Sequence, residues 1–390
     1  MKTLSIGRLN YDINIFMEEY PKENTKNVTK EIVSCSGSSA SVIAYALGKW
    51  NMESFISGVV GYDEIGNAMK KDMEENHVKT TYLETNYDIK TPASYILVNK
   101  QNNSHTKIVT ELNKFNIRKF DYDQSMDCII TDGNEYNAFS YAIGKFNNAI
   151  SILNAKMPHQ ELLDYFKIVK YVVCSKEVAE AIMGMKIDYE NPISMSTIYK
   201  KMMDKYPHIT LFITIPGRGT IYSLNNEIKV LATMNGEALD ETGARDVFVA
   251  MISYGLTNDY DLETTIRLAT IAENMSKKSI GATLSIPILS DIINFYESKF
   301  GKIQKNEEIN KENVTEVQIE TTTNHTIQPQ PVSTLNESMP TYQNTIEQPS
   351  FNPFAGTIFN EEKTKQEQPI TPLVQNQAEE ETEPNASTPR

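Results

Sequence analysis

The amino-acid sequence predicts an α/β fold built on an open, largely parallel sheet. Over residues 1–302, short runs rich in β-branched residues alternate with longer helical patterns, and several of these runs are flanked by glycine. This alternation is typical of strand–helix–strand units, whose strands pair in parallel. The composition changes sharply near residue 303, so the predicted globular part ends there.

Strands are expected where β-branched and other apolar residues fill short runs bounded by turn residues. In chain order these runs are Thr3–Gly7, Phe55–Val60, Ser94–Val98, Cys128–Thr131, Ala149–Leu153, Tyr171–Cys174, Leu211–Thr214 and Thr220–Ser223. Helices are expected where apolar residues recur at helical spacing. They are Ala40–Trp50, Ile65–Asn76, Asn137–Phe146, Gln160–Phe166, Glu177–Met183 and Ser196–Lys205.

Segment 90–109 is expected to form a β-hairpin. Ser94–Val98 and Lys107–Val109 alternate around the polar turn Gln101–Asn103. Ligands of open α/β sheets bind beyond the carboxyl ends of the strands, so the site is expected at that edge.

Size and charge exclude several classes of protein. The chain has 390 residues and a formal net charge of -14, which argues against nucleic acid as a general partner. Its cysteines, Cys35, Cys128 and Cys174, lie far apart and form no C-x-x-C pair, so neither a zinc site nor a disulfide framework is indicated. No apolar run suits a signal peptide or a membrane span. We therefore expect a soluble, cytoplasmic protein that does not act at a membrane.

Residues 303–390 are expected to form a disordered tail. From Lys305 onward there are fourteen Glu and no Asp against four Lys and one Arg, and the segment is rich in Gln, Asn, Thr and Pro. Such a composition buries too little apolar surface to offset the entropy of ordering. Phe351, Phe354 and Phe359 interrupt it. Residues 351–359 are either a docking motif for a protein partner or incidental hydrophobic spacing.

The most informative run is 240–250. Gly243, Ala244 and Arg245 form a tight turn that places Asp246 at the start of the apolar stretch Val247–Leu256. Apolar residues at nearly every position predict a helix buried on most sides. The free N–H groups at its start would attract an anion, and Asp246 could accept a proton from a hydroxyl. The alternative is an acidic residue that only stabilises the helix N-terminus.

Two earlier segments supply polar groups and small residues near strand ends. Asn10 and Asp12 follow the first strand, where an amide and a carboxylate can hold hydroxyl groups. Gly37 lies in a loop of small residues that enters a helix, and small residues let a ligand approach the backbone closely. An ordinary turn and helix packing would also explain these segments.

The order and spacing of the motifs resemble those of the ribokinase, or PfkB-type, carbohydrate kinases over about residues 3–295. Run 240–246 is similar to the family's Asp-Thr-x-Gly-Ala-Gly-Asp signature, with Arg245 in place of the last Gly. The segment 58–66 matches its Gly-x-x-Gly-x-Asp-x-x-Gly run. The resemblance implies a three-layer α/β/α kinase domain over residues 1–302. It also implies a small β lid from strands around 10–20 and 90–110, through which a homodimer could form.

The resemblance also implies a reaction and a set of site residues. The reaction is ATP- and Mg2+-dependent phosphorylation of a hydroxyl on a sugar or related polyol. Asp246 would be the catalytic base, and the amides of Gly243, Ala244 and Arg245 the anion hole. Asn10, Asp12 and Gly37 would hold the acceptor. The residues expected along the nucleotide are Thr214, Gly219, Thr270 and Gly281.

The chain departs from the family pattern at six matched positions. They are Ser38, Val42, Ser175, Val178, Pro216 and Arg245. Ser175 and Val178 stand where the family has the Asn and Glu that organise magnesium through water, so no metal ligand is assigned. Arg245 would place its guanidinium on the transferring phosphate or fill the phosphate position. A catalytically impaired relative that acts as a ligand-binding or interaction module through its tail, and a nucleoside kinase, stay open as alternatives.

Overall fold

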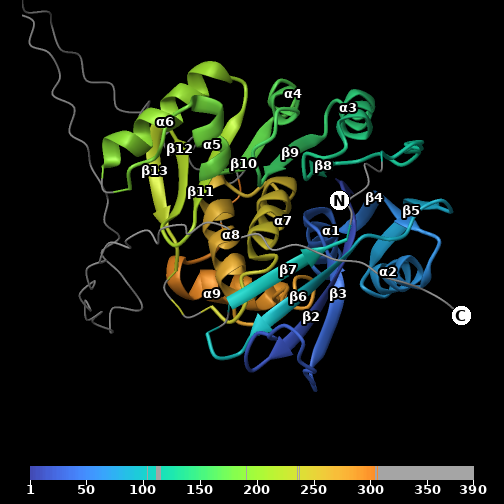
Figure 1. Cartoon of the computed structure of the whole chain (residues 1–390). Coiled ribbons are helices and arrows are strands. Elements are labelled where there is room, and N and C mark those ends of the chain that lie inside the picture. The colour runs from blue at the N-terminus through green and yellow to red at the C-terminus, as the bar shows by residue number, and fades with distance from the viewer. Residues whose placement is uncertain are drawn as a thin grey trace, which may run out of the picture. The chain divides into compact units, whose positions relative to one another are not determined.

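The computed structural model describes residues 1–102, 104–110, 116–189, 191–234, 236, 238–303 and 305. A nine-stranded sheet forms its centre, in the order β13-β12-β11-β10-β9-β8-β1-β4-β5 (Figure 1). Pairing is parallel from β5 through to β11 and antiparallel at β12 and β13. The strands are β1 (Lys2–Ile6), β4 (Glu53–Gly61), β5 (Val78–Asn86), β8 (Cys128–Thr131), β9 (Ile150–Ala155), β10 (Tyr171–Ser175), β11 (Thr210–Ile215), β12 (Gly219–Leu224) and β13 (Glu227–Ala232).

Helices cover both faces of this sheet, and each face has its own apolar core. One core is formed with α1 (Ser39–Lys49), α2 (Glu64–Glu75), α7 (Ala244–Thr257), α8 (Leu262–Ser276) and α9 (Leu289–Phe300). The other core is formed with α3 (Tyr136–Lys145), α4 (Leu162–Phe166), α5 (Lys176–Met183) and α6 (Pro192–Lys205). The predicted three-layer α/β/α class is confirmed.

Helix α7 lies between other helices and the sheet. It packs against α1 and α8 and against strands β8 and β9. Eleven of its fourteen residues are buried, from Ala244 to Thr257, as the unbroken apolar run predicts. A helix enclosed in this way is held rigidly, so its first turn is a fixed platform at the sheet edge.

A smaller sheet stands apart from the main one, in the order β3-β2-β6-β7 (Figure 1). Its strands are β2 (Asn10–Met17), β3 (Ile32–Gly37), β6 (Ala93–Asn99) and β7 (Ser104–Val109). Strands β6 and β7 pair antiparallel from Asn99 and Ser104, as expected of the 90–109 hairpin. Strand β2 follows β1 directly, so the small sheet begins where the first strand of the main sheet ends.

Some elements differ from the sequence expectations. Strands β3, β5 and β13 and helix α9 were not expected, and helix α8 ends at Ser276. Beyond Ser276 the chain forms turns, and Gly281 has a φ of +91°. Residues 306–390, including the Phe351–Phe359 motif, lie outside the described residues.

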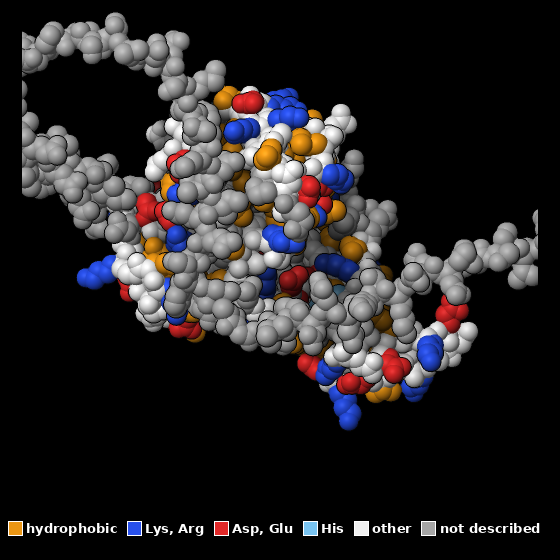
Figure 2. Space-filling model, turned by 90° about the vertical axis from the view of Figure 1, so that its left-hand side faces the viewer, with side chains coloured by type: hydrophobic (Ala, Val, Ile, Leu, Met, Phe, Trp, Pro, Cys, Tyr) orange, Lys and Arg blue, Asp and Glu red, His pale blue; other side chains and the backbone are white. Residues whose placement is uncertain are grey.

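The described surface carries mixed charge. On the face in Figure 2, Lys and Arg side chains are interspersed with Asp and Glu side chains. Among the described residues, no helix combines the length and apolar character needed to cross a bilayer.

Candidate active site

The turn before α7 lies where strands β9, β10 and β11 end. Gly243 has a φ of +80°, a left-handed conformation that favours glycine. A Cβ added there would lie 3.1 Å from the backbone of Ala282. The turn before α7 and the loop after α8 are therefore in close contact at a position where only glycine fits without strain.

Asp240 fastens these two segments together. Its buried carboxylate accepts a hydrogen bond from the N–H of Thr242 at 2.8 Å and one from the N–H of Gly281 at 2.9 Å. The backbone N–H groups of Leu239 and Asp240 also donate to the carbonyl of Lys277. The first Asp of the signature is thus a structural residue that shapes the turn.

Asp246 is buried in the first turn of α7. One carboxylate oxygen accepts from the side-chain amide of Asn154 at 2.8 Å, and the other lies 3.0 Å from the Lys156 ammonium. Only 3% of the Asp246 side chain is exposed, compared with 45% of that of Lys156. The carboxylate is therefore ion-paired on its open side and fixed by an amide on its buried side.

Backbone N–H groups surround the start of α7. The amides of Gly243, Arg245 and Asp246 have no acceptor within the described part of the chain, whereas that of Ala244 donates to the carbonyl of Glu241 at 3.2 Å. Orphan amides at a helix N-terminus are an anion site, and the helix dipole adds to the attraction. Three of the four amides in the turn are free for this purpose.

The side chain of Arg245 runs along the edge of the sheet, and the backbone at this residue is not strained. It lies in α7, and it is not among the residues with positive φ. Its Nε donates to the Asn154 side-chain oxygen at 3.1 Å, and Nη1 donates to the Thr214 hydroxyl at 2.5 Å. Its Nη2 donates to the carbonyls of Ala155 and Val173, at 3.1 and 2.9 Å. One side chain thereby ties together the carboxyl ends of three strands.

A second polar group lies at the start of the small sheet. Asn10 donates to the Asp12 carboxylate at 2.6 Å and to the Ser94 hydroxyl at 2.9 Å. Gly37 pairs with Asn10 across β2 and β3, and a Cβ on Gly37 would come within 2.3 Å of the Asp12 carboxylate. Lys107, on β7, lies 3.2 Å from Asp12. The three predicted acceptor residues are therefore neighbours.

The small sheet meets the α7 turn through residues 282–283. The Cys35 thiol, on β3, lies beside the backbone N–H groups of Ala282 and Thr283, and its surroundings include Asp12. Ala282 is also the residue that Gly243 contacts. Burial raises the pKa of the Cys35 thiol. The acceptor residues and Asp246 thus lie on either side of one shared loop.

The four residues expected along the nucleotide lie in different structural settings. Thr214 ends β11 and contacts Arg245. The Gly281 amide is bonded to Asp240, and the Thr270 hydroxyl donates within α8 to the carbonyl of Ile266. Gly219 has a φ of +126°, and a Cβ there would meet a β13 carbonyl at 2.0 Å, so this glycine permits the β12–β13 pairing.

The positions matched to magnesium residues carry no metal-ligand set. Val178 is fully buried in the apolar core, and the Ser175 hydroxyl accepts from its backbone N–H as the cap of α5. Glu177 is exposed and lies 3.9 Å from Lys176. Within the described ranges, no three His, Cys, Asp or Glu residues are grouped to hold a metal ion. These side chains do not fit the water-mediated metal site that the resemblance implies.

Two further carboxyl groups lie near the ends of β1 and β8. Burial raises the pKa of Asp132 to about 6 and that of Glu135 to about 7. Backbone hydrogen bonds from Asn134 and Arg8 to Asp132, and from Ile117 to Glu135, partly oppose this effect. Both groups titrate near neutral pH because desolvation outweighs their hydrogen bonds.

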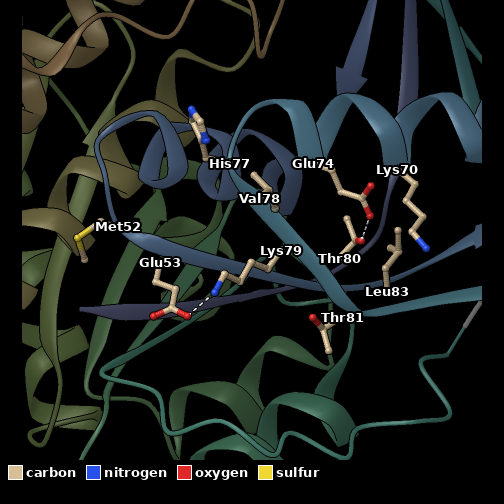
Figure 3. Close-up of a pocket in the computed structure, with 10 residues that line it drawn as sticks. All are labelled: Met52, Glu53, Lys70, Glu74, His77, Val78, Lys79, Thr80, Thr81 and Leu83. Atoms are coloured by element: carbon tan, nitrogen blue, oxygen red, sulfur yellow. Dashed lines mark hydrogen bonds and ion pairs between the residues drawn. The ribbon is translucent and has the colours of Figure 1, made fainter.

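A surface depression lies away from this site. Its lining includes Glu53 and Lys79, which form an ion pair, and Glu74 and Thr80, which share a hydrogen bond (Figure 3). Glu53 and Val78 begin strands β4 and β5, so the depression adjoins the amino ends of the strands. Ligands of such sheets bind at the opposite edge.

Sequence reasoning missed Asn154, Lys156 and Lys107. Asn154 is a single buried amide in the otherwise apolar strand β9, and Lys156 directly follows that strand. A polar residue at the carboxyl end of an apolar run is a usable signal, but the expected strand stopped at Leu153. Lys107 carried no signal, because exposed lysines are common on edge strands.

Comparison with known proteins places the chain in a family. The profile described as "pfkB family carbohydrate kinase" matches residues 2–289. The ribokinase of Staphylococcus aureus is 22% identical over 305 residues, which cover 75% of this chain and 98% of that protein. The nucleoside kinase of Methanocaldococcus jannaschii is 22% identical over 302 residues, covering 75% and 95%. The solved ribokinase of Arabidopsis thaliana, complexed with ribose and ATP, superposes with a TM-score of 0.61 at 15% identity, covering 75% and 97%.

Fold, site and comparisons thus define a sugar or nucleoside kinase of ribokinase-like architecture. The chain belongs to the pfkB family of carbohydrate kinases.

Proposed function

We propose that this protein transfers the γ-phosphoryl group of ATP to a hydroxyl of a sugar or related polyol. The observation that carries the proposal is the first turn of α7, where the buried Asp246 carboxylate stands beside the free amides of Gly243, Arg245 and Asp246. A base and an anion cradle within one turn are the parts that phosphoryl transfer to an alcohol requires.

In the proposed reaction, Asp246 accepts the proton of the attacking hydroxyl. The hydroxyl oxygen forms a bond to the γ-phosphorus as the bond to the bridging oxygen of ADP breaks. The free amides of the turn hold the negative charge that develops on the phosphoryl oxygens. Asn154 keeps the base oriented by its hydrogen bond of 2.8 Å. A rigid α7 favours this arrangement because small displacements of a base are costly.

The acceptor is proposed to lie between Asp246 and the small sheet. Asn10 and Asp12 offer an amide and a carboxylate to its hydroxyls, and the absence of a side chain at Gly37 leaves room beside Asp12. Lys107 and Lys156 are each about half exposed and ion-paired with Asp12 and Asp246. Each can swing aside as an acceptor hydroxyl takes its place.

ATP is proposed to lie along the ends of β10 and β11, with Thr214 towards the phosphates and Gly219, Thr270 and Gly281 further along. The complex of the Arabidopsis ribokinase with ATP supports this donor. Mg2+ stays a prediction from the resemblance, since Ser175 and Val178 supply no ligand for it. A homodimer through the small sheet and a cytoplasmic location likewise stay predictions.

A nucleoside is the second candidate acceptor. The similarity to a nucleoside kinase favours it, and a nucleoside also presents a sugar hydroxyl to the base. The interaction role of the tail concerns residues outside the described ranges.

ADP release across a panel of sugars and nucleosides tests the proposal. Asp246→Asn is expected to lower kcat by about 10²–10⁴-fold, the usual contribution of a positioned general base. Binding of ATP should change little. Asp291→Asn is the matched control, because Asp291 lies in the first turn of α9 and is exposed. An unchanged rate for Asp246→Asn would refute the assignment of the base.

A further inference from the structure

Arg245 carries a positive charge that forms no direct ion pair with an acidic side chain of the described residues. Asp246, Glu273 and Glu177 act on it only from beyond ion-pair distance. All four of its hydrogen bonds go to neutral acceptors, namely the side-chain oxygens of Asn154 and Thr214 and the carbonyls of Ala155 and Val173. No described carboxylate lies within ion-pair distance of its guanidinium. Burial lowers its pKa, so desolvation of this cation is costly. Buried charges are normally paired, so a buried cation without a direct ion pair is a candidate site for an anion.

One N–H donor of the guanidinium has no acceptor among the described residues. Arginine has five N–H donors, and the hydrogen bonds above use four of them. The remaining N–H belongs to Nη1, the nitrogen that contacts Thr214 at the end of β11. One of the free amides of the α7 turn is the backbone N–H of Arg245 itself. Arg245 therefore has two donors without an acceptor among the described residues, one on its side chain and one on its backbone.

The same place lacks groups for a metal ion. Ser175 pairs with Thr214 across β10 and β11, so the matched metal positions adjoin the guanidinium. Val178 is buried and apolar, and the Ser175 hydroxyl is engaged in capping α5. The positive charge of Arg245 therefore lies where the chain has no side chains that would organise a metal ion. Hydrogen bonds to three strands hold the guanidinium in this position.

We infer that Arg245 is the resident cation of the nucleotide subsite, so that this protein binds the polyphosphate of a nucleoside triphosphate without needing a divalent metal. The inference rests on the proposed function, which places ATP at this edge of the sheet. It concerns the binding of the nucleotide and not the transfer of the phosphoryl group. Arg245 is assigned the role of positioning the nucleotide phosphates, a role that a metal ion would otherwise fill.

The test is a titration of the full chain with ATP, once in EDTA and once in excess Mg2+. The two dissociation constants of the unchanged protein should agree within about threefold, because the guanidinium supplies the charge in both cases. Arg245→Gly should lose at least about tenfold in affinity in EDTA, and Mg2+ should restore part of that loss. Arg267→Ala is the control, since Arg267 pairs with Glu263 on α8 and contacts no strand end.

Each outcome decides a separate question. Binding of ATP only in the presence of Mg2+ would overturn the inference and leave the proposed function standing. Metal-free binding by Arg245→Gly that equals or exceeds that of the unchanged protein would also overturn it, and would show that the side chain fills the phosphate position. Binding in neither condition would refute the proposed function itself. Arg245→Lys keeps the positive charge but not the planar guanidinium with its several donors. If the glycine variant unfolds, a metal-free affinity of Arg245→Lys below that of the unchanged protein supports the inference, and an equal affinity overturns it.

Discussion

Replacing Gly243 by alanine should destabilise the protein through two separable terms. The first is the left-handed backbone at φ +80°, which costs an L-residue about 1–2 kcal/mol. The second is contact, because the new Cβ would lie 3.1 Å from the backbone of Ala282 and that backbone cannot rotate away. Overpacking of this kind costs about 1–3 kcal/mol. The expected loss is therefore about 2–5 kcal/mol, or roughly 5–10 °C in Tm.

Thermal unfolding of three glycine variants separates these terms. Gly184 caps α5 at φ +63° with open space around it, so Gly184→Ala should show the backbone term alone. Gly144 is exposed within α3 and has no positive φ, so Gly144→Ala should stabilise by about 0.5–1 kcal/mol. Gly243→Ala should also lower kcat, because the free amides would shift. Equal losses for Gly184→Ala and Gly243→Ala, or a Gly243 variant with full activity, would refute the reasoning.

Two further predictions concern buried carboxyl groups. The pKa of Glu135 rises from its usual 4.5 to about 7 on folding, so its contribution to stability is present below pH 4.5 and is lost as the pH rises to 7. Glu135→Gln should remove this loss, worth about 3 kcal/mol, and its Tm relative to the unchanged protein should be higher at pH 8 than at pH 5; a constant difference contradicts the assignment. Asp240→Ala leaves the amides of Thr242 and Gly281 without an acceptor and should cost about 2–4 kcal/mol in urea unfolding. A cost below about 1 kcal/mol would mean that water replaces the carboxylate.

The fold was readable from the sequence wherever apolar runs are long or sharply bounded. The parallel strands from β8 to β11 are buried on both faces, and they appear as short continuous apolar runs. The missed strands β5 and β13 alternate or are largely polar, with exposed residues such as Lys79 and Glu227. Their position in the sheet is set by pairing with neighbours, which local periodicity does not report.

The site was readable in part. The turn at Gly243 and the candidate base Asp246 could be predicted from the sequence, because a glycine turn and an acidic residue at a helix start depend on neighbouring residues of the chain. Arg245 was expected to place its guanidinium on the transferring phosphate or to fill the phosphate position, and the structure shows that the side chain is bonded to the ends of the strands. Its partners at Ala155, Val173 and Thr214 belong to three different strands, and such long-range contacts leave no trace in a single sequence. The same holds for the ion pair of Lys156.

Asn154 donates to Asp246 through its amino group and accepts from Arg245 through its oxygen. Its side chain is fully buried, so a flip of the amide would set two donors and two acceptors against each other at once. The amide of Asn154 therefore has one fixed orientation, and it joins the neighbouring residues Arg245 and Asp246, which carry opposite charge. Loss of the Asn154 amide would therefore free the Arg245 guanidinium and the Asp246 carboxylate from each other at once, although the two side chains lie in different parts of the site.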